Sequence, residues 1–132
     1  IGSSLVGSEM CIRDRLYSLL GSKSDIKTDN KILFIEDLDE YLYHVDRMII
    51  SLKRAGKFNN IKAMIVGSMT KMHDNKIKFG MNAKEIIKYH TKEFNFPVCF
   101  NFPVGHQKNN RPVILGKVSK LDINSNLVCL SQ

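Results

Sequence analysis

The sequence contains no long apolar run and no recognisable export signal. Its longest apolar runs, residues 32–35 and 63–66, are far shorter than the roughly 20 residues that a membrane-spanning helix needs. The N-terminus lacks the charged, apolar and small-residue regions that together mark a signal peptide. We therefore expect a cytoplasmic protein with no membrane partner.

Cysteine is scarce as well. The three cysteines, Cys11, Cys99 and Cys129, form no CxxC pair, and so small and odd a set excludes a disulfide-rich secreted scaffold. Cys99 and Cys129 lie inside the apolar runs 97–100 and 127–130, where a cysteine is more often a small buried hydrophobe than a nucleophile. We expect both to be buried, in a protein of a reducing compartment.

Several signatures of catalysis are also missing. There is no Walker loop, no GxGxxG turn, no HExxH pair and no GxSxG elbow. Zinc sites usually show at least one closely spaced pair of ligands. We expect no metal site, because no such pair is found among His44, His73, His90 and His106. No serine is a convincing nucleophile; turn, helix or loop positions are expected for Ser22, Ser24, Ser51 and Ser68.

What the chain does contain is the composition of one globular domain. A hydrophobic content of 43% and a charged content of 25% are typical of folded proteins and argue against disorder. The net charge of +7 raises the question of nucleic acid, but the lysines are scattered and no basic run carries interleaved aromatics. We expect a solvated basic surface and no nucleic-acid partner, with a non-catalytic basic binding domain as the open alternative.

Residues 1–15 (IGSSLVGSEMCIRDR) differ from the rest of the chain. They show neither helical nor strand periodicity and lead into no recognisable helix cap. The stretch SSLVGSEMCIRDR resembles the peptide produced when sequencing-adapter DNA is translated in frame with a gene fragment, and such segments are excluded from fold reasoning. We interpret 1–15 as a non-native segment without function and 16–132 as the natural domain. A genuine flexible extension is the alternative.

From Leu16 onward the pattern predicts alternating strands and helices. Short apolar runs at 31–35, 62–67 and 97–100 are typical of buried strands. Between the first two lies an amphipathic helix, ended by Gly56 and with an inward stripe formed by Val45, Met48, Ile49 and Leu52.

A second helix is predicted to begin at the capping pair Asn82 and Glu85. Its inward face would be provided by Ile86, Ile87 and Phe94. Residues 68–80, with turn chemistry and little apolar content, are predicted to form a loop before it.

Two further strands are predicted at 112–118 and 126–130. Strands that alternate with helices indicate right-handed crossovers and parallel pairing. We therefore predict an α/β fold, with a small mixed, partly parallel sheet flanked by helices and a β-rich C-terminal end.

Two places carry candidate chemistry: Glu36, directly after the first strand, and His106, just after the third. Ligands of open α/β sheets gather beyond the carboxyl ends of the strands. A carboxylate and an imidazole at that edge can form the base-and-orienter half of a catalytic triad, although the spacing alone is also compatible with an ordinary surface histidine. The neighbouring acids Asp37, Asp39 and Glu40 precede a helix, and for at least two of the four acids we expect stabilisation of the positive helix end.

The ordered set of motifs resembles the C-terminal domain of the LD-carboxypeptidase family, which includes the muramoyltetrapeptide carboxypeptidases and the microcin-immunity serine peptidases. The motifs are KILFIEDLDE, DRMIISLKRAGKFNNIKAMIVGSM and FPVCFNFPVGHQKNNRPVILG, spanning about 16–121. Any one is weak, but all of them in order are specific. The resemblance implies a Ser–His–Glu triad in which Glu36 matches the glutamate that ends the strand motif and His106 matches the Gly-His motif.

By the same resemblance the nucleophilic serine belongs to an N-terminal domain that this chain lacks, so the chain alone is expected to be inactive. The whole enzyme would hydrolyse the amide before a terminal D-amino acid in cytoplasmic muropeptides during peptidoglycan recycling, as a homodimer without a metal or organic cofactor. A microcin-immunity-type peptidase of the same family and an inactive homologue are the alternatives.

Overall fold

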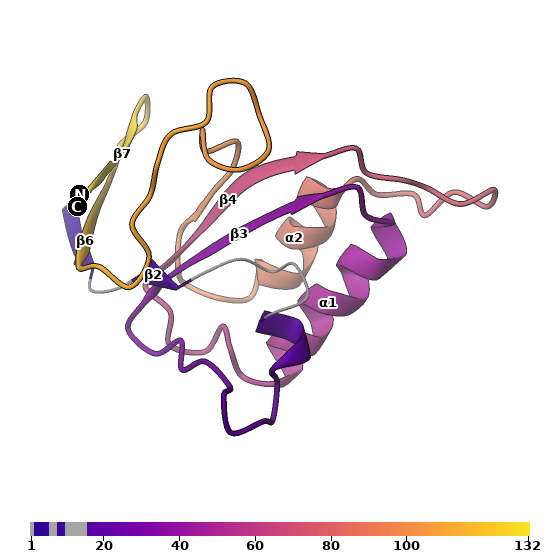
Figure 1. Ribbon diagram of the computed structural model, residues 1–132, viewed down its shortest axis with the longest axis horizontal. Coiled ribbons are helices and arrows are strands. Elements are labelled where there is room, and N and C mark those ends of the chain that lie inside the picture. Colours follow the sequence, from indigo (N-terminus) through magenta and orange to yellow (C-terminus); the bar gives the residue numbers. More distant parts are fainter. Residues whose placement is uncertain (1, 6–7, 10–15) are drawn as a thin grey trace.

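The computed structural model describes residues 2–5, 8–9 and 16–132. The described chain forms two sheets, with strand orders β2-β3-β4-β5 and β1-β6-β7, and the helices α1 and α2 pack beside the first of them (Figure 1). The elements in chain order are β1 (Gly2–Leu5), β2 (Ser8–Glu9), β3 (Ile32–Leu38), α1 (Leu42–Arg54), β4 (Ala63–Thr70), α2 (Ala83–Thr91), β5 (Val98–Cys99), β6 (Ser119–Ile123) and β7 (Val128–Ser131).

The four-stranded sheet is parallel and has a core on each face. Every neighbouring pair in it is parallel, as the strand–helix alternation predicts. Alternate β3 residues point to opposite sides: Leu33 and Ile35 join the core on the helical side, and Ile32 and Phe34 join the core beneath the β6–β7 hairpin. β3 is therefore buried on both sides, which explains its continuous apolar run.

The helices cover one face of this sheet, and their sequence signals are confirmed except for Phe94, which was expected on the second helix but follows the end of α2 at Thr91. α1 buries the expected stripe of Val45, Met48, Ile49 and Leu52. Gly56, at φ +73°, ends α1 in a left-handed conformation, with Lys57 N donating to Leu52 O at 3.0 Å. α2 begins at the predicted capping box, in which Glu85 N donates to Asn82 Oδ1 and Asn82 N donates to Glu85 Oε2.

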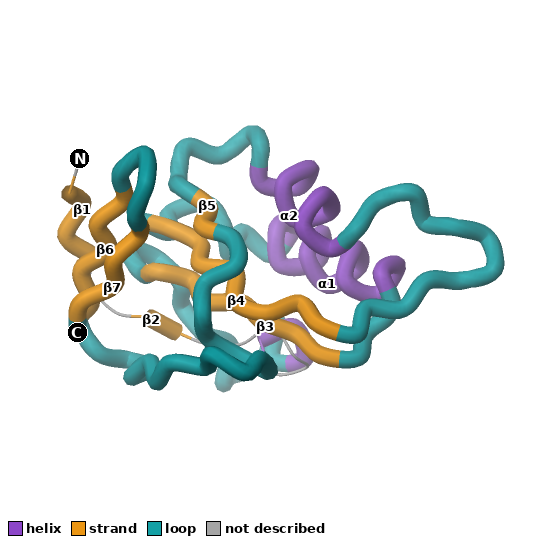
Figure 2. The backbone as a smooth tube through the Cα atoms, turned by 90° about the horizontal axis from the view of Figure 1, so that it is seen from above, coloured by secondary structure: helices purple, strands orange, loops and turns teal. Residues whose placement is uncertain are grey.

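The hairpin formed by β6 and β7 lies on the opposite side from the helices (Figure 2). Leu121 is fully buried there, against Phe34 and Ile65 of the parallel sheet. The predicted β-rich C-terminal end is therefore present. It forms a separate antiparallel layer rather than an extension of the parallel sheet.

Several predicted elements differ from the structure; the last strand, for instance, is Val128–Ser131 rather than 126–130. Residues 112–118 are not a strand; the chain there is irregular, and the strand begins at Ser119. β5 has only two residues instead of the four predicted at 97–100. The predicted loop at 68–80 begins later, at Lys71, because β4 continues to Thr70 beside an equally extended β3. Apolar runs predicted burial at these sites, but backbone pairing decided where each strand ends.

A β-bulge interrupts the β3–β4 pairing. Ile35 lies opposite Val66, and the next pair is Asp37 with Met69. Two β4 residues, Gly67 and Ser68, therefore lie opposite the single residue Glu36. A bulge of this kind re-aims the side chains of the strand that carries it.

Residues 1–15 lie partly outside the described residues, and Cys11 is among those not described. β1 pairs antiparallel with β6, and β2 pairs parallel with β3. These two stretches form strands although the segment shows no strand periodicity. Pairing to a sheet edge uses backbone groups, which need no side-chain alternation. The non-native origin of the segment remains a prediction.

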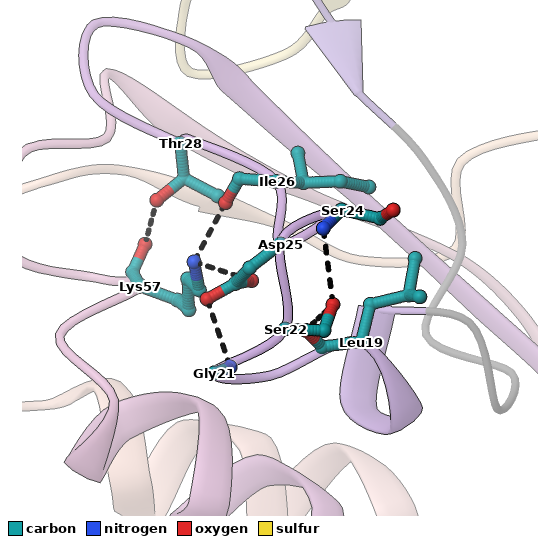
Figure 3. Close-up of polar contacts among 8 residues, drawn as sticks. All are labelled: Leu19, Gly21, Ser22, Ser24, Asp25, Ile26, Thr28 and Lys57. Atoms are coloured by element: carbon teal, nitrogen blue, oxygen red, sulfur yellow. Dashed lines mark hydrogen bonds and ion pairs between the residues drawn. The ribbon is translucent and has the colours of Figure 1, made fainter.

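The segment before β3 is held to the end of α1 by Lys57 (Figure 3). The Lys57 side chain is nearly buried; its Nζ donates to Ile26 O at 2.6 Å and lies 2.8 Å from Asp25 Oδ1. Thr28 Oγ1 donates to Lys57 O at 2.7 Å. Because Lys57 hydrogen-bonds to Asp25, the pKa of that carboxyl is held below its ordinary value.

Within the described part of the chain, no helix is long and apolar enough to cross a membrane.

Candidate active site

Glu36 points from β3 to the face opposite the helices. It follows Phe34 by two residues, so it shares that residue's side of the sheet. Its side chain is 10% exposed. The residue lies within the strand rather than after it, because β3 continues to Leu38. Gly67 makes room for it, since a Cβ there would lie 3.3 Å from the Glu36 Cβ and 2.4 Å from Val104 O.

His106 is positioned by a segment that follows the edge of β4. Phe102 N donates to Val66 O at 3.1 Å, and Ser68 N donates to Val104 O at 3.0 Å. The chain then turns at Gly105, whose φ of +115° favours glycine. Gly105 N donates to Asn110 Oδ1 at 3.0 Å, which helps to hold the turn that presents His106.

The two predicted site residues meet. His106 Nδ1 lies 3.0 Å from Glu36 Oε2, across 70 positions of sequence. The His106 side chain is 52% exposed and that of Glu36 is 10% exposed. The carboxylate of the pair is therefore buried, whereas the imidazole reaches solvent. Among the described residues, His106 Nε2 has no hydrogen-bond partner.

This geometry suits a general base. A carboxylate that accepts from Nδ1–H fixes the tautomer whose Nε2 lone pair is free, and it stabilises the imidazolium that forms when Nε2 takes a proton. An open Nε2 can then reach a nucleophile that lies outside the pair. The arrangement therefore has the geometry of a histidine–carboxylate pair of the kind found in catalytic triads.

A cavity of about 340 Å³ opens beside the pair. Besides Glu36 and His106 it has two polar side chains, Asn110 and Arg111, and an apolar wall formed by Phe34, Val104, Pro112, Val113 and Leu115. An apolar cleft with a few convergent polar groups is the usual form of a small-ligand site. The irregular segment 112–118, mistaken for a strand, thus provides one wall of the cavity.

The other histidines also contact acids, but elsewhere. His90 contacts Asp46 between the helices, and the two remaining pairs are His44 with Glu40 and His73 with Asp39. No group of three or more metal-binding side chains occurs among the residues that the structure describes. The histidines are dispersed into four separate pairs, as their sequence spacing suggests.

The expectation that at least two of the four acids stabilise the positive end of the helix is wrong, because the first turn of α1 contains no acidic residue. Asp37 lies in β3 and is buried, and Asp39 contacts His73. Only Glu40 lies close to α1, just before its first turn, where its Oε1 accepts from Tyr41 N at 2.8 Å. The two strands extend beyond the apolar run, so the helix begins later than the acidic cluster suggests.

The cysteine prediction holds for one residue. Cys99 is buried, and burial raises the pKa of its thiol, which leaves it a poor nucleophile. Cys129 is exposed, contrary to expectation. Alternate residues of β7 turn outward, since only one face of the hairpin is covered.

Sequence reasoning missed two residues near the pair. Ser68 was assigned to a loop but lies in β4 and is buried. Arg111 was not singled out and lines the cavity. The position of Ser68, at the end of a strand that neighbours β3, was the available signal. The position of Arg111 depends on the turn at residues 105–111, and the helical and strand periodicities of the sequence do not predict such a turn.

Comparisons with known proteins agree with this architecture. The LD-carboxypeptidase C-terminal domain family matches residues 2–121. A Rickettsia conorii protein named as a carboxypeptidase is 32% identical over 92% of this chain and 35% of its own length. A Bacillus subtilis protein named as a murein peptide carboxypeptidase is 30% identical over 85% of this chain and 34% of its own length. The chain thus spans about a third of these curated relatives.

Solved structures share the fold. The muramoyltetrapeptide carboxypeptidase from Oxalobacter formigenes aligns with a TM-score of 0.78 at 23% identity, over 98% of this chain and 45% of that one. The microcin C7 self-immunity protein MccF aligns with a TM-score of 0.68 at 22% identity, over 91% of this chain and 36% of that one. At these identities the likeness concerns the fold alone. The family match, which covers most of the chain, shows that this chain belongs to the LD-carboxypeptidase C-terminal domain family.

Proposed function

We propose that the protein to which this chain belongs is a serine-type LD-carboxypeptidase, for which the chain supplies the glutamate and histidine of a Ser–His–Glu triad. The observation that carries the proposal is the contact between His106 Nδ1 and the buried Glu36 carboxylate, with Nε2 directed away from the pair. The serine would come from residues outside this chain, whose relatives are about three times as long.

In this proposal His106 transfers the protons. Its Nε2 accepts the serine proton as the serine oxygen bonds to the amide carbonyl carbon, and Glu36 stabilises the resulting imidazolium. The imidazolium returns the proton to the amide nitrogen as the carbon–nitrogen bond breaks, which releases the terminal amino acid. Water then hydrolyses the ester by the same route and restores the serine.

Arg111 gives the cavity a cation suited to the carboxylate of a carboxypeptidase substrate. It lines the cavity that holds the pair, and no ion-pair partner for it is found among the described residues. A guanidinium binds a carboxylate through two parallel hydrogen bonds, which fixes the orientation of the bound group. The terminal carboxylate of a peptide is the group that this position fits.

The substrate we propose is a cytoplasmic muropeptide, cleaved before a terminal D-amino acid in peptidoglycan recycling. The names of two matching proteins, murein peptide carboxypeptidase and muramoyltetrapeptide carboxypeptidase, support this choice. The proposed reaction needs no metal or organic cofactor, because the three side chains perform the proton transfers. The complete enzyme is proposed to be a homodimer, and residues 16–132 alone to be inactive.

The test is an assay of the complete gene product, obtained by sequencing the native locus upstream of Leu16. Release of D-alanine from an L,D-linked tetrapeptide muropeptide should fall by more than about 10³-fold in Glu36→Gln. The matched control, Asp46→Asn, removes the carboxylate of a different histidine pair and should keep most of the activity. Hydrolysis of a peptidyl-nucleotide in place of the muropeptide would favour the microcin-immunity alternative. Failure to cleave either substrate would overturn the proposal.

A further inference from the structure

Ser68 reaches the Glu36 side of the sheet only because of the β-bulge. Val66 faces the helical core, so strict alternation would turn Ser68 to that same side. Instead Met69 packs against the helical core. The extra residue in β4 therefore shifts the alternation by one and aims Ser68 at the opposite face.

The Ser68 hydroxyl lies beside the carboxylate that holds His106. A Cβ built on Gly105 would be 2.4 Å from Ser68 Oγ and 3.0 Å from Glu36 Oε2. Both oxygens thus lie within 3.0 Å of one point next to the Gly105 backbone. The Glu36 oxygen concerned is the same one that contacts His106 Nδ1.

The hydroxyl is buried without a hydrogen-bond partner. Ser68 is 8% exposed, and its Oγ neither reaches water nor bonds to any described group. A buried hydroxyl without a partner loses its hydrogen bonds to water and gains none in return, so native proteins keep few of them. The unpartnered group points to a role that the resting arrangement does not fulfil.

We propose that Ser68 is a positioning residue for the Glu36–His106 pair. In solution its hydroxyl, which turns about a single side-chain torsion, donates to the Glu36 carboxylate that His106 Nδ1 contacts. The donated bond keeps Oε2 aimed at Nδ1. This inference rests on the proposed function, because positioning matters only if the pair transfers protons.

The test uses the 132-residue chain and ¹⁵N NMR of the His106 ring, whose shifts report which nitrogen carries the proton. Wild type should show the Nδ1–H form with a slowly exchanging Nδ1 proton. Ser68→Ala should speed exchange of that proton roughly tenfold and mix the two tautomers. Ser68→Thr, which retains the hydroxyl, should restore the wild-type spectrum.

Two further variants make the result specific. Ser119→Ala removes an equally buried hydroxyl, whose Oγ donates to Lys117 O, and should leave the His106 ring unchanged. Ser68→Cys keeps the shape but donates only weakly; it should resemble Ser68→Ala and replaces it if the alanine variant does not fold.

The outcomes separate the two proposals. If Glu36→Gln changes the His106 ring but neither Ser68→Ala nor Ser68→Cys does, Ser68 is a packing residue and the present inference is overturned. If Glu36→Gln itself leaves the ring unchanged, the pair does not set the tautomer and the proposed catalytic pair fails with it.

Discussion

Two histidine–carboxylate pairs in this chain have similar contact distances but differ in which partner is buried: the acid in one pair and the imidazole in the other. His106 Nδ1 lies 3.0 Å from Glu36, and His90 Nε2 lies 2.7 Å from Asp46. In the first pair the acid side chain is 10% exposed and the imidazole 52%; in the second the acid is 27% exposed and the imidazole 7%. One pair presents its imidazole to a cavity, whereas the other encloses it between two helices.

The difference teaches that a contact with an acid does not identify a catalytic histidine. All four histidines of the chain have such a contact. What separates His106 is that its acid is buried and its second nitrogen is open, which a general base requires. His90 instead links α2 to Asp46 of α1, and the Lys53–Glu93 ion pair joins α1 to the turn that follows α2.

The largest expected difference between the pairs is in catalysis. In the complete enzyme, His106→Gln should lower kcat/KM on the muropeptide by more than about 10³-fold, because no other group accepts the serine proton. His90→Gln should stay within about threefold of wild type, since it lies in the helix interface. Steady-state assays of both variants test this. Comparable losses in the two would mean that the pairs do not differ in function.

For the free energy of unfolding, the expected order is the opposite: the His90 variant should lose more than the His106 variant. His90→Ala should lower the free energy of unfolding of the chain by about 3 kcal/mol, because it leaves a cavity between the helices and an unpartnered Asp46. His106→Ala should lower it by about 1 kcal/mol or less, since the half-exposed ring leaves no cavity. Urea unfolding followed by circular dichroism measures both. A larger loss in His106→Ala would assign the site pair a mainly structural role.

Much of the arrangement behind this comparison could be predicted from the sequence. Periodicity predicted both helices, and capping chemistry placed the start of α2 at Asn82. Glu36 and His106 each lie near the carboxyl end of a parallel strand or of its extension, and such ends share one edge of a sheet. Strand topology placed both residues at one edge of the sheet, but on spacing alone His106 could equally be an ordinary surface histidine. The pairing with Glu36 came from the resemblance to the LD-carboxypeptidase family.

The remainder depends on pairing between distant segments. The bulge that aims Ser68 exists only when β3 and β4 are aligned, and neither strand encodes it alone. The exposure of Cys129 depends on which hairpin face is covered. The wall formed by 112–118 depends on the turn at Gly105. The local sequence pattern therefore predicts helices and strands well. It predicts poorly the features that arise only when two segments pair or pack, such as the bulge and the covered face of the hairpin.

Gly105 offers a way to disrupt one pair while sparing the other. In Gly105→Ala the new Cβ would meet Ser68 Oγ at 2.4 Å and Glu36 Oε2 at 3.0 Å, at a φ of +115°. We expect a loss of about 2 kcal/mol beyond that of Gly80→Ala, which also has positive φ but open space around it. The His106 NMR signals should shift and those of His90 should not. Equal losses in the two variants would show that backbone conformation alone matters at Gly105.

The smallest effect concerns a third pair, Asp25 with Lys57. The pKa of Asp25 is lowered in the folded chain, chiefly by its hydrogen bond from Lys57. A lowered folded-state pKa adds stability that is fully present above the ordinary value of 3.8 and is lost as the pH falls through the folded value. The Tm difference between wild type and Asp25→Asn should therefore be constant from about pH 5 to 7 and shrink below pH 4. Asp29→Asn, which removes an exposed carboxylate bonded to Asn60, is the matched control and should show a smaller difference. A Tm difference that does not shrink below pH 4 would show that the ionised carboxylate of Asp25 is not what stabilises the chain.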